Sequence, residues 1–174
     1  MRFDSLIGAL QLSLQQELDV INVLNDDTYR APSNGPFTSS IGMHIRHNLD
    51  HFEAFFAGMD GAKIDYEGRS RNRMIEELPE RAKQTLVAYI KKLETLRHLE
   101  DADLEVREES DDGVEDRRWL MSSVGRELQF LLGHTVHHNA LIAMIVHGHG
   151  CDFPESFGVA PSTQRYERER SASS

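Results

Sequence analysis

Histidine is the residue type in this 174-residue chain whose spacing could do chemistry, because six of the nine histidines fall into two short windows. The first window has steps of three and four residues, and in the second window two histidines follow the first by three and four residues. Such offsets place side chains on one face of a helix. Imidazole nitrogens gathered in this way can bind a divalent metal ion. The two windows are His44, His47 and His51, and His134, His137 and His138.

His134 and His138 form an HxxxH pair, whose four-residue step stacks two imidazoles one helical turn apart. Two such nitrogens can ligate one ion from a single helix, and a third from the first window would complete a three-histidine site. Such a site keeps an open coordination position, which a catalytic metal needs and a closed structural zinc site lacks. Nitrogen ligands without a thiolate suit Zn²⁺ and Ni²⁺, with Mn²⁺ or Fe²⁺ as alternatives. Without a metal, the same histidines would form a polar network in the core.

Ligating imidazoles also need a carboxylate or carbonyl partner on the second ring nitrogen. Asp50, Glu53 and Glu127 are acidic residues close to the histidine windows in the sequence. They are candidates for this partner, but the sequence does not pair them with particular histidines, and solvated surface is the favoured interpretation for at least two of the three.

The histidine windows lie in amphipathic segments that predict helices. Apolar residues recur at three- and four-residue steps over residues 3–24, 39–58 and 79–97, and residues 122–150 are apolar on more than one side. Pro79 suits the first turn of its helix, because its missing N–H would be unpaired there. We therefore predict an all-α protein, a four-helix bundle in which the last long helix is the most buried.

The connections between these helices differ in length and composition. Residues 25–37 are rich in Asn, Asp, Pro and Gly, and are expected to hold no helix. Residues 59–78 are long enough for a crossover and predict a short helical turn before Pro79. Residues 104–109 and 114–120 flank the turn signal SDDG, which predicts a small hairpin before the last helix, with an irregular acidic loop as the alternative.

Length and composition exclude several classes of protein. We expect a single domain over residues 1–174, with about residues 166–174 as a disordered tail. The net charge of −10, from 19 basic and 29 acidic residues, argues against nucleic-acid binding. No apolar stretch reaches the roughly 18 residues of a membrane span, and the first residues lack the apolar core of a signal peptide. The single cysteine, Cys151, excludes an internal disulfide and a cysteine-based metal cage, so we expect a cytoplasmic protein.

Two segments, SSIGMHIRHNLDHFEAFF and LLGHTVHHNALIAMI, carry a resemblance to a known family. With the helix order and connection lengths, they make the chain similar to the DinB-like (DinB/YfiT) superfamily of metal-dependent four-helix-bundle proteins. The resemblance covers essentially the whole chain. It implies a divalent metal held by one histidine of the second long helix and an HxxxH pair of the last one.

Carried onto this sequence, the HxxxH pair falls on His134 and His138. The remaining ligand of the family follows the start of its helix by about seven positions, which places it on His47 when counted from Ser40. The resemblance therefore implies His47, His134 and His138 as metal ligands. The alternates, which neighbour these residues, are His51, His44 and His137.

The resemblance further implies a metalloenzyme that acts on a small molecule, by thiol-dependent S-transfer or by hydrolysis. A bound metal would lower the pKa of a thiol or water, which would then attack an electrophile. The thiol would be a low-molecular-weight one from solution. The alternative is a non-catalytic metal-binding or stress-response bundle in which the metal is structural. A homodimer is expected, because small bundles with a long crossover often pair.

Two further segments have more than one interpretation. Arg69, Arg71 and Arg73 gather in an acidic chain. They could clamp an anionic substrate, but ion pairs that tie residues 59–78 to the acidic helices are the favoured role. Residues 157–166 could cover the metal as a lid, form an interface, or simply pack on the bundle.

Overall fold

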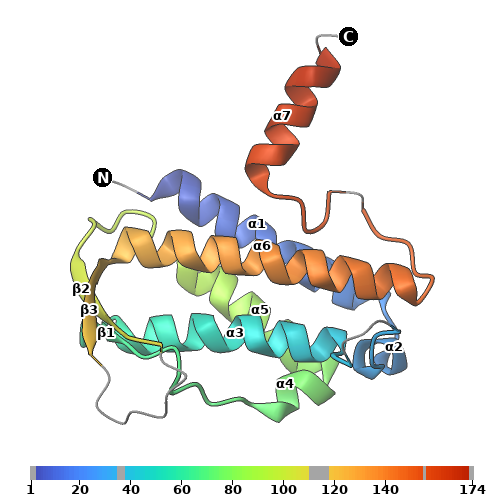
Figure 1. Ribbon diagram of the computed structural model, residues 1–174, viewed down its shortest axis with the longest axis horizontal. Coiled ribbons are helices and arrows are strands. Elements are labelled where there is room, and N and C mark those ends of the chain that lie inside the picture. The colour runs from blue at the N-terminus through green and yellow to red at the C-terminus, as the bar shows by residue number, and fades with distance from the viewer. Residues whose placement is uncertain (1–2, 35–37, 110–117, 155, 173–174) are drawn as a thin grey trace.

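The computed structural model describes residues 3–34, 38–109, 118–154 and 156–172. These residues form a helical bundle with a small sheet at one end (Figure 1). The helices are α1 (Asp4–Val23), α2 (Asp26–Arg30), α3 (Ile41–Gly58), α4 (Arg73–Glu77), α5 (Pro79–Glu94), α6 (Val124–Gly148) and α7 (Pro161–Ala172). The strands are β1 (Lys63–Ile64), β2 (Asp103–Arg107) and β3 (Trp119–Ser123).

Four long helices make the body of the molecule, as the hydrophobic periodicity predicts. Helix α1 packs against α5 and α6, and α3 also packs against both of these helices. Their apolar stripes meet in one core, in which Leu14, Phe52 and Leu128 are fully buried. Burial of these stripes is what holds the helices together, because isolated helices of this length are marginal in water. No helix of the described residues is both long and apolar enough to cross a membrane.

The expectation that residues 25–37 hold no helix is wrong. Helix α2 begins directly after Asn25, whose side-chain oxygen accepts a hydrogen bond from the Thr28 amide at 2.9 Å. Tyr29 then buries its ring in the core and donates its hydroxyl to the carbonyl of Ile75 at 2.7 Å. An N-cap and one buried anchor therefore stabilise a five-residue helix that composition alone argues against.

The sheet lies at the end of the bundle where α3 ends and α6 begins. Strands β2 and β3 pair antiparallel, with Glu105 opposite Met121, which confirms antiparallel pairing before the last long helix. Strand β3 begins at Trp119, and the SDDG turn and residues 114–117 of the predicted hairpin lie outside the described residues. Strand β1 adds a parallel edge beside β2, with Lys63 opposite Glu105. Two residues are too short for periodicity to reveal this strand.

The connection from α3 to α5 crosses one side of the bundle. It carries β1 and then α4, which confirms the short helical turn predicted before Pro79. Asn72 caps α4 by accepting a hydrogen bond from the Met74 amide at 3.1 Å. Between these two elements, residues 65–72 run along α3 and approach the histidines.

The C-terminal segment differs from the expected disordered tail. Residues Pro161–Ala172 form α7, which projects away from the bundle in Figure 1. No residue of α7 is buried. Pro161 suits a helix start, and charged residues of both signs follow, so local propensity accounts for the helix. Because α7 has no apolar stripe, the periodicity of apolar residues does not signal it.

Candidate metal centre

The two histidine windows face each other because α3 and α6 pack side by side (Figure 1). Serine caps set the first turn of each helix. Ser40 accepts a hydrogen bond from the Met43 amide at 3.1 Å, and Ser123 accepts one from the Arg126 amide at 3.3 Å. Each histidine face is thereby set in register by a cap and by the apolar residues that flank it.

Three imidazoles converge between these helices. His47 and His51 come from α3 and His134 comes from α6, and each offers a nitrogen within 4.8 Å of the other two. The ring centroids of His51 and His134 are 3.9 Å apart, and those of His47 and His134 are 5.2 Å apart. His51 is buried, and the other two are half-buried. We call these three residues the histidine cluster; it could hold one metal ion.

His138 lies at the edge of the histidine cluster. Its ring centroid is 4.5 Å from that of His134 and 4.8 Å from that of His47. Its Nδ1 atom, however, lies 3.0 Å from Nδ1 of His44, so the two rings share a hydrogen bond. His44 in turn contacts the hydroxyl of Ser39 through Nε2 at 2.9 Å.

Contacts on the outer ring nitrogens orient two members of the histidine cluster. Nδ1 of His51 lies 2.8 Å from the carbonyl oxygen of His47, and Nδ1 of His134 lies 3.3 Å from Oδ1 of Asn48. Both partners are acceptors, so each imidazole donates from Nδ1. The lone pair on Nε2 is thereby left for a metal, which is how metal-binding histidines are commonly oriented.

Asn48 connects the histidine cluster to a second polar group deeper in the bundle. Its Nδ2 donates to Oε1 of Glu17 on α1 at 2.6 Å, and its Oδ1 also accepts from the hydroxyl of Thr135 at 3.1 Å. We call Glu17, Asn48 and Thr135 the inner polar cluster; all three are completely buried. Burial raises the pKa of Glu17 to about 8, although the bond from Asn48 partly opposes this shift. Glu17 is therefore mainly protonated and neutral at pH 7.

Burial also keeps the imidazoles neutral. It lowers the pKa of His47 and of His51 to about 4, and that of His134 to about 2. The neighbouring histidines lower the pKa values of His47 and His134 further, because two imidazolium charges repel each other at such distances. The Arg69 guanidinium lowers that of His51. Neutral imidazole is the form that ligates a metal, so the donor set suits a divalent cation at pH 7.

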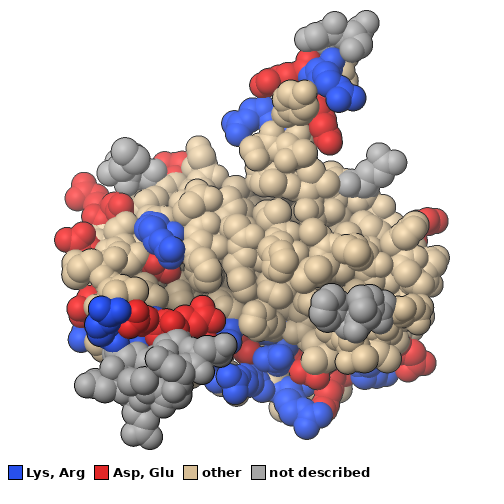
Figure 2. All heavy atoms as spheres, viewed as in Figure 1, with Lys and Arg blue, Asp and Glu red and all other residues tan. Residues whose placement is uncertain are grey.

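A pocket of about 410 Å³ opens onto the histidine cluster. Apolar side chains of the sheet and α6, including Val106, Leu120 and Phe130, form part of its wall. Tyr66 also lines it and donates its hydroxyl to the buried Glu127 at 2.9 Å. In Figure 2 the charged side chains gather at the sheet end and along the lower edge of the visible face, whereas its centre is largely uncharged.

The structure brings some of the sequence-predicted residues together and separates others. His47 and His134 are in the histidine cluster, together with the alternate His51. His138 and His44 lie next to it, whereas His137 is exposed.

The acidic residues expected to orient the imidazoles are engaged elsewhere. Asp50 pairs with Arg46 at 2.8 Å, Glu53 accepts from Ser70, and Glu127 accepts from Tyr66. The orienting contacts come instead from two carbonyl oxygens, those of the Asn48 side chain and the His47 backbone. Asp50 and Glu127 are buried, so the interpretation of at least two of the three acids as solvated surface is wrong. A signal was present for Glu17, which lies at helical spacing between the buried residues Leu14 and Ile21 and so falls on the apolar stripe of α1.

The structure distinguishes the roles of the three arginines and of the loop at residues 157–166. Arg69 reaches the histidine cluster, whereas Arg71 is exposed and Arg73 pairs with Glu77 at 3.1 Å. The loop at Gly158 packs on α6, where a Cβ atom would lie 2.6 Å from the backbone nitrogen of Ala140. Packing therefore accounts for this loop, and none of its described residues lines the pocket.

The fold and the site define a helical-bundle protein with a histidine cluster that could hold a metal ion. Comparison with protein families identifies this class more closely. The model of the DinB superfamily matches residues 9–142, and the chain belongs to this superfamily. The matched range runs from α1 through most of α6 and includes all six histidines of the two windows. Neither the curated proteins nor the solved structures give a significant match to the chain.

Proposed function

We propose that this protein is a metalloenzyme of the DinB/YfiT four-helix-bundle type, which binds one divalent metal through His47, His51 and His134. The observation that carries the proposal is the convergence of three neutral imidazoles at the floor of an open pocket. Three nitrogen ligands without a thiolate favour Zn²⁺ or Ni²⁺. A bound metal would supply Lewis acidity, which lowers the pKa of a thiol or water.

The proposed reaction is attack by a small nucleophile on a small electrophilic substrate. Thiol-dependent S-transfer and hydrolysis are the two forms of this chemistry. The chain's own free thiol, Cys151, follows the end of α6 and does not line the pocket, so the nucleophile comes from solution. The protein residues orient the imidazoles, shield the site on its inner side and leave the outer side open to the pocket.

Metal content tests the proposal directly. Protein purified without a histidine tag should retain a stoichiometric metal, and the variant with both His51→Ala and His134→Ala should lose it. Substitution of Co²⁺ for the native metal then reports coordination by its visible absorption. Three protein ligands with exchangeable solvent support an enzyme, whereas four protein ligands and no exchangeable position support a structural metal.

A thiol-transfer screen tests the reaction type. Glutathione, bacillithiol and mycothiol would each be offered with a set of electrophiles, with hydrolysis of the electrophile alone followed in parallel. Turnover that requires the metal and a thiol identifies an S-transferase. Metal-dependent turnover that is independent of thiol identifies a hydrolase, and turnover unaffected by metal removal contradicts the proposal.

A further inference from the structure

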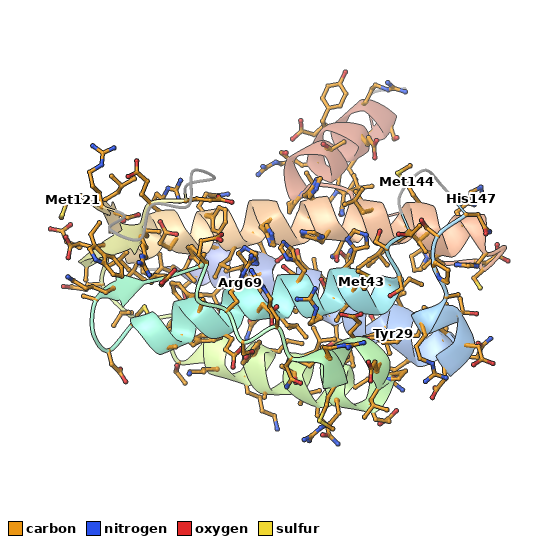
Figure 3. All side chains as sticks on the ribbon, turned by 60° about the horizontal axis from the view of Figure 1, so that its bottom comes forward. Tyr29, Met43, Arg69, Met121, Met144 and His147 are labelled. Atoms are coloured by element: carbon orange, nitrogen blue, oxygen red, sulfur yellow. The ribbon has the colours of Figure 1, made fainter. Side chains whose placement is uncertain are left out.

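Arg69 is a charged residue that contacts the histidine cluster directly. Its side chain is only 11% exposed, and it lines the same pocket. The Nη1 atom lies 2.9 Å from Nε2 and 3.1 Å from Nδ1 of His51. Figure 3 places Arg69 beside the middle of α3, where this helix faces α6. A guanidinium group therefore lies against the lone pair that a metal would use.

The positive charge of Arg69 is poorly balanced. Among the described residues, the one carboxylate paired with it is Glu67, at 4.0 Å, which is the outer limit for an ion pair. Its buried Nε atom has no hydrogen-bond partner there. A largely buried guanidinium in such surroundings costs free energy unless an anion accepts its hydrogen bonds.

Three other acids near the pocket are engaged with other cations. Asp65 pairs with Arg107 at 2.8 Å, and Glu127 pairs with Arg126 at 3.0 Å. Glu108 pairs with Arg118 at 2.8 Å. Three neutral imidazoles would also leave the charge of a divalent metal uncompensated, so the open side of the site would carry two neighbouring positively charged groups.

We propose that Arg69 binds a carboxylate group of the substrate beside the histidine cluster. The inference rests on the proposed metal site, since a metal on Nε2 of His51 would displace the contact that Nη1 now makes. The freed guanidinium then offers paired N–H donors to a carboxylate, an arrangement that matches the planar fork of arginine. The substrate class is thus a small molecule that carries a carboxylate and reacts a few atoms away from it.

Two thiols that differ in one group test this inference without a measurement of activity. Co²⁺-loaded protein would be titrated with 3-mercaptopropionate and with 3-mercapto-1-propanol, and the dissociation constants obtained from thiolate-to-cobalt absorption. We expect the wild type to prefer the carboxylate by about 10-fold or more, the typical effect of a hydrogen bond to a charged group. Arg69→Gln should remove this preference.

Arg71→Gln is the matched control, because it removes the same charge from an exposed position in the same segment. It should keep the preference of the wild type. Arg69→Lys retains the charge but loses the fork, and should show a reduced preference. This variant also decides the matter if Arg69→Gln fails to fold, since an unchanged preference in Arg69→Lys would then overturn the assignment.

Failure of the inference can be told apart from failure of the proposed function. If the wild type takes up no Co²⁺, the metal site is wrong, and the carboxylate site falls with it. If Co²⁺ binds in the wild type and Arg69→Gln, but both bind the two thiols equally, the metal site stands and the role of Arg69 is overturned.

Discussion

The bundle contains two neighbouring polar clusters, which meet at the contact between Asn48 and His134, and their surroundings differ. The inner polar cluster of Glu17, Asn48 and Thr135 is sealed among α1, α3 and α6 and is completely buried. The histidine cluster begins at His134, which contacts Asn48, and opens onto the pocket. The inner polar cluster uses hydrogen bonds to join helices, whereas the histidine cluster keeps nitrogen lone pairs on its open side. Polarity in a core therefore indicates a ligand site only where acceptors remain accessible.

Removal of two proposed ligands from the histidine cluster should have the largest effect on metal affinity. The combined His51→Ala and His134→Ala variant should lose metal affinity by more than about 100-fold, because removal of orienting groups alone costs up to that much. Competition with a chromophoric chelator measures the affinity. His137→Ala is the control, since it removes an exposed imidazole from the same helix. Equal affinity in the variant and the control would show that the histidine cluster does not bind the metal.

The contributions of the inner polar cluster and of the histidine cluster to the free energy of unfolding should change with pH in opposite directions. The pKa of Glu17 is raised from 4.5 to about 8 in the fold, so its contribution to stability is fully present below pH 4.5 and is lost as the pH rises toward 8. The pKa values of His47 and His51 are lowered from 6.5 to about 4, so their contribution is present above pH 6.5 and is lost as the pH falls toward 4.

Glu17→Gln isolates the pH dependence that the inner polar cluster contributes. Glutamine keeps an oxygen that accepts from Asn48 but cannot ionise. We expect it to stabilise the metal-free fold at pH 8 by on the order of 4 kcal/mol and to have little effect at pH 4.5. Urea unfolding at both pH values measures the difference. Asp19→Asn, the same kind of change at an exposed position of the same helix, is the control. A difference between Glu17→Gln and the wild type that stays constant with pH would contradict the raised pKa of Glu17.

Periodicity was sufficient to predict the four long helices of the body and the two histidine faces, but not α2 or α7. His47 and His134 fall on these faces because the rotation of each residue about a helix follows from its number. The partners of Asn48 and Arg69 could not be predicted in this way. They depend on how α1 packs behind α3 and on the path of residues 65–72 across it, and both are set by tertiary packing.

Asn48→Ala should break the connection between the two groups. It removes the acceptor for His134 and the donor for Glu17, so buried groups on both sides lose a partner. We expect a cost of about 2–3 kcal/mol in the free energy of unfolding and a roughly 10-fold loss in metal affinity. Thr135→Val is the matched control. The Thr135 hydroxyl contacts Asn48 and the Leu131 carbonyl in the inner polar cluster, away from the histidine cluster. The substitution should cost about 1 kcal/mol and leave metal affinity unchanged.

His138→Ala should have the smallest effect on metal binding, and it decides between two ligand sets. The family resemblance implies His138 as a ligand, whereas in the structure Nδ1 of His138 is shared with His44 and the third nearby imidazole is His51. If the ligands are those of the histidine cluster, His138→Ala should retain stoichiometric metal with an affinity reduced by less than about 10-fold, the lower range for an outer contact. His51→Ala should lose the metal. The reverse order would mean that the metal draws His138 away from its contact with His44 and does not use His51.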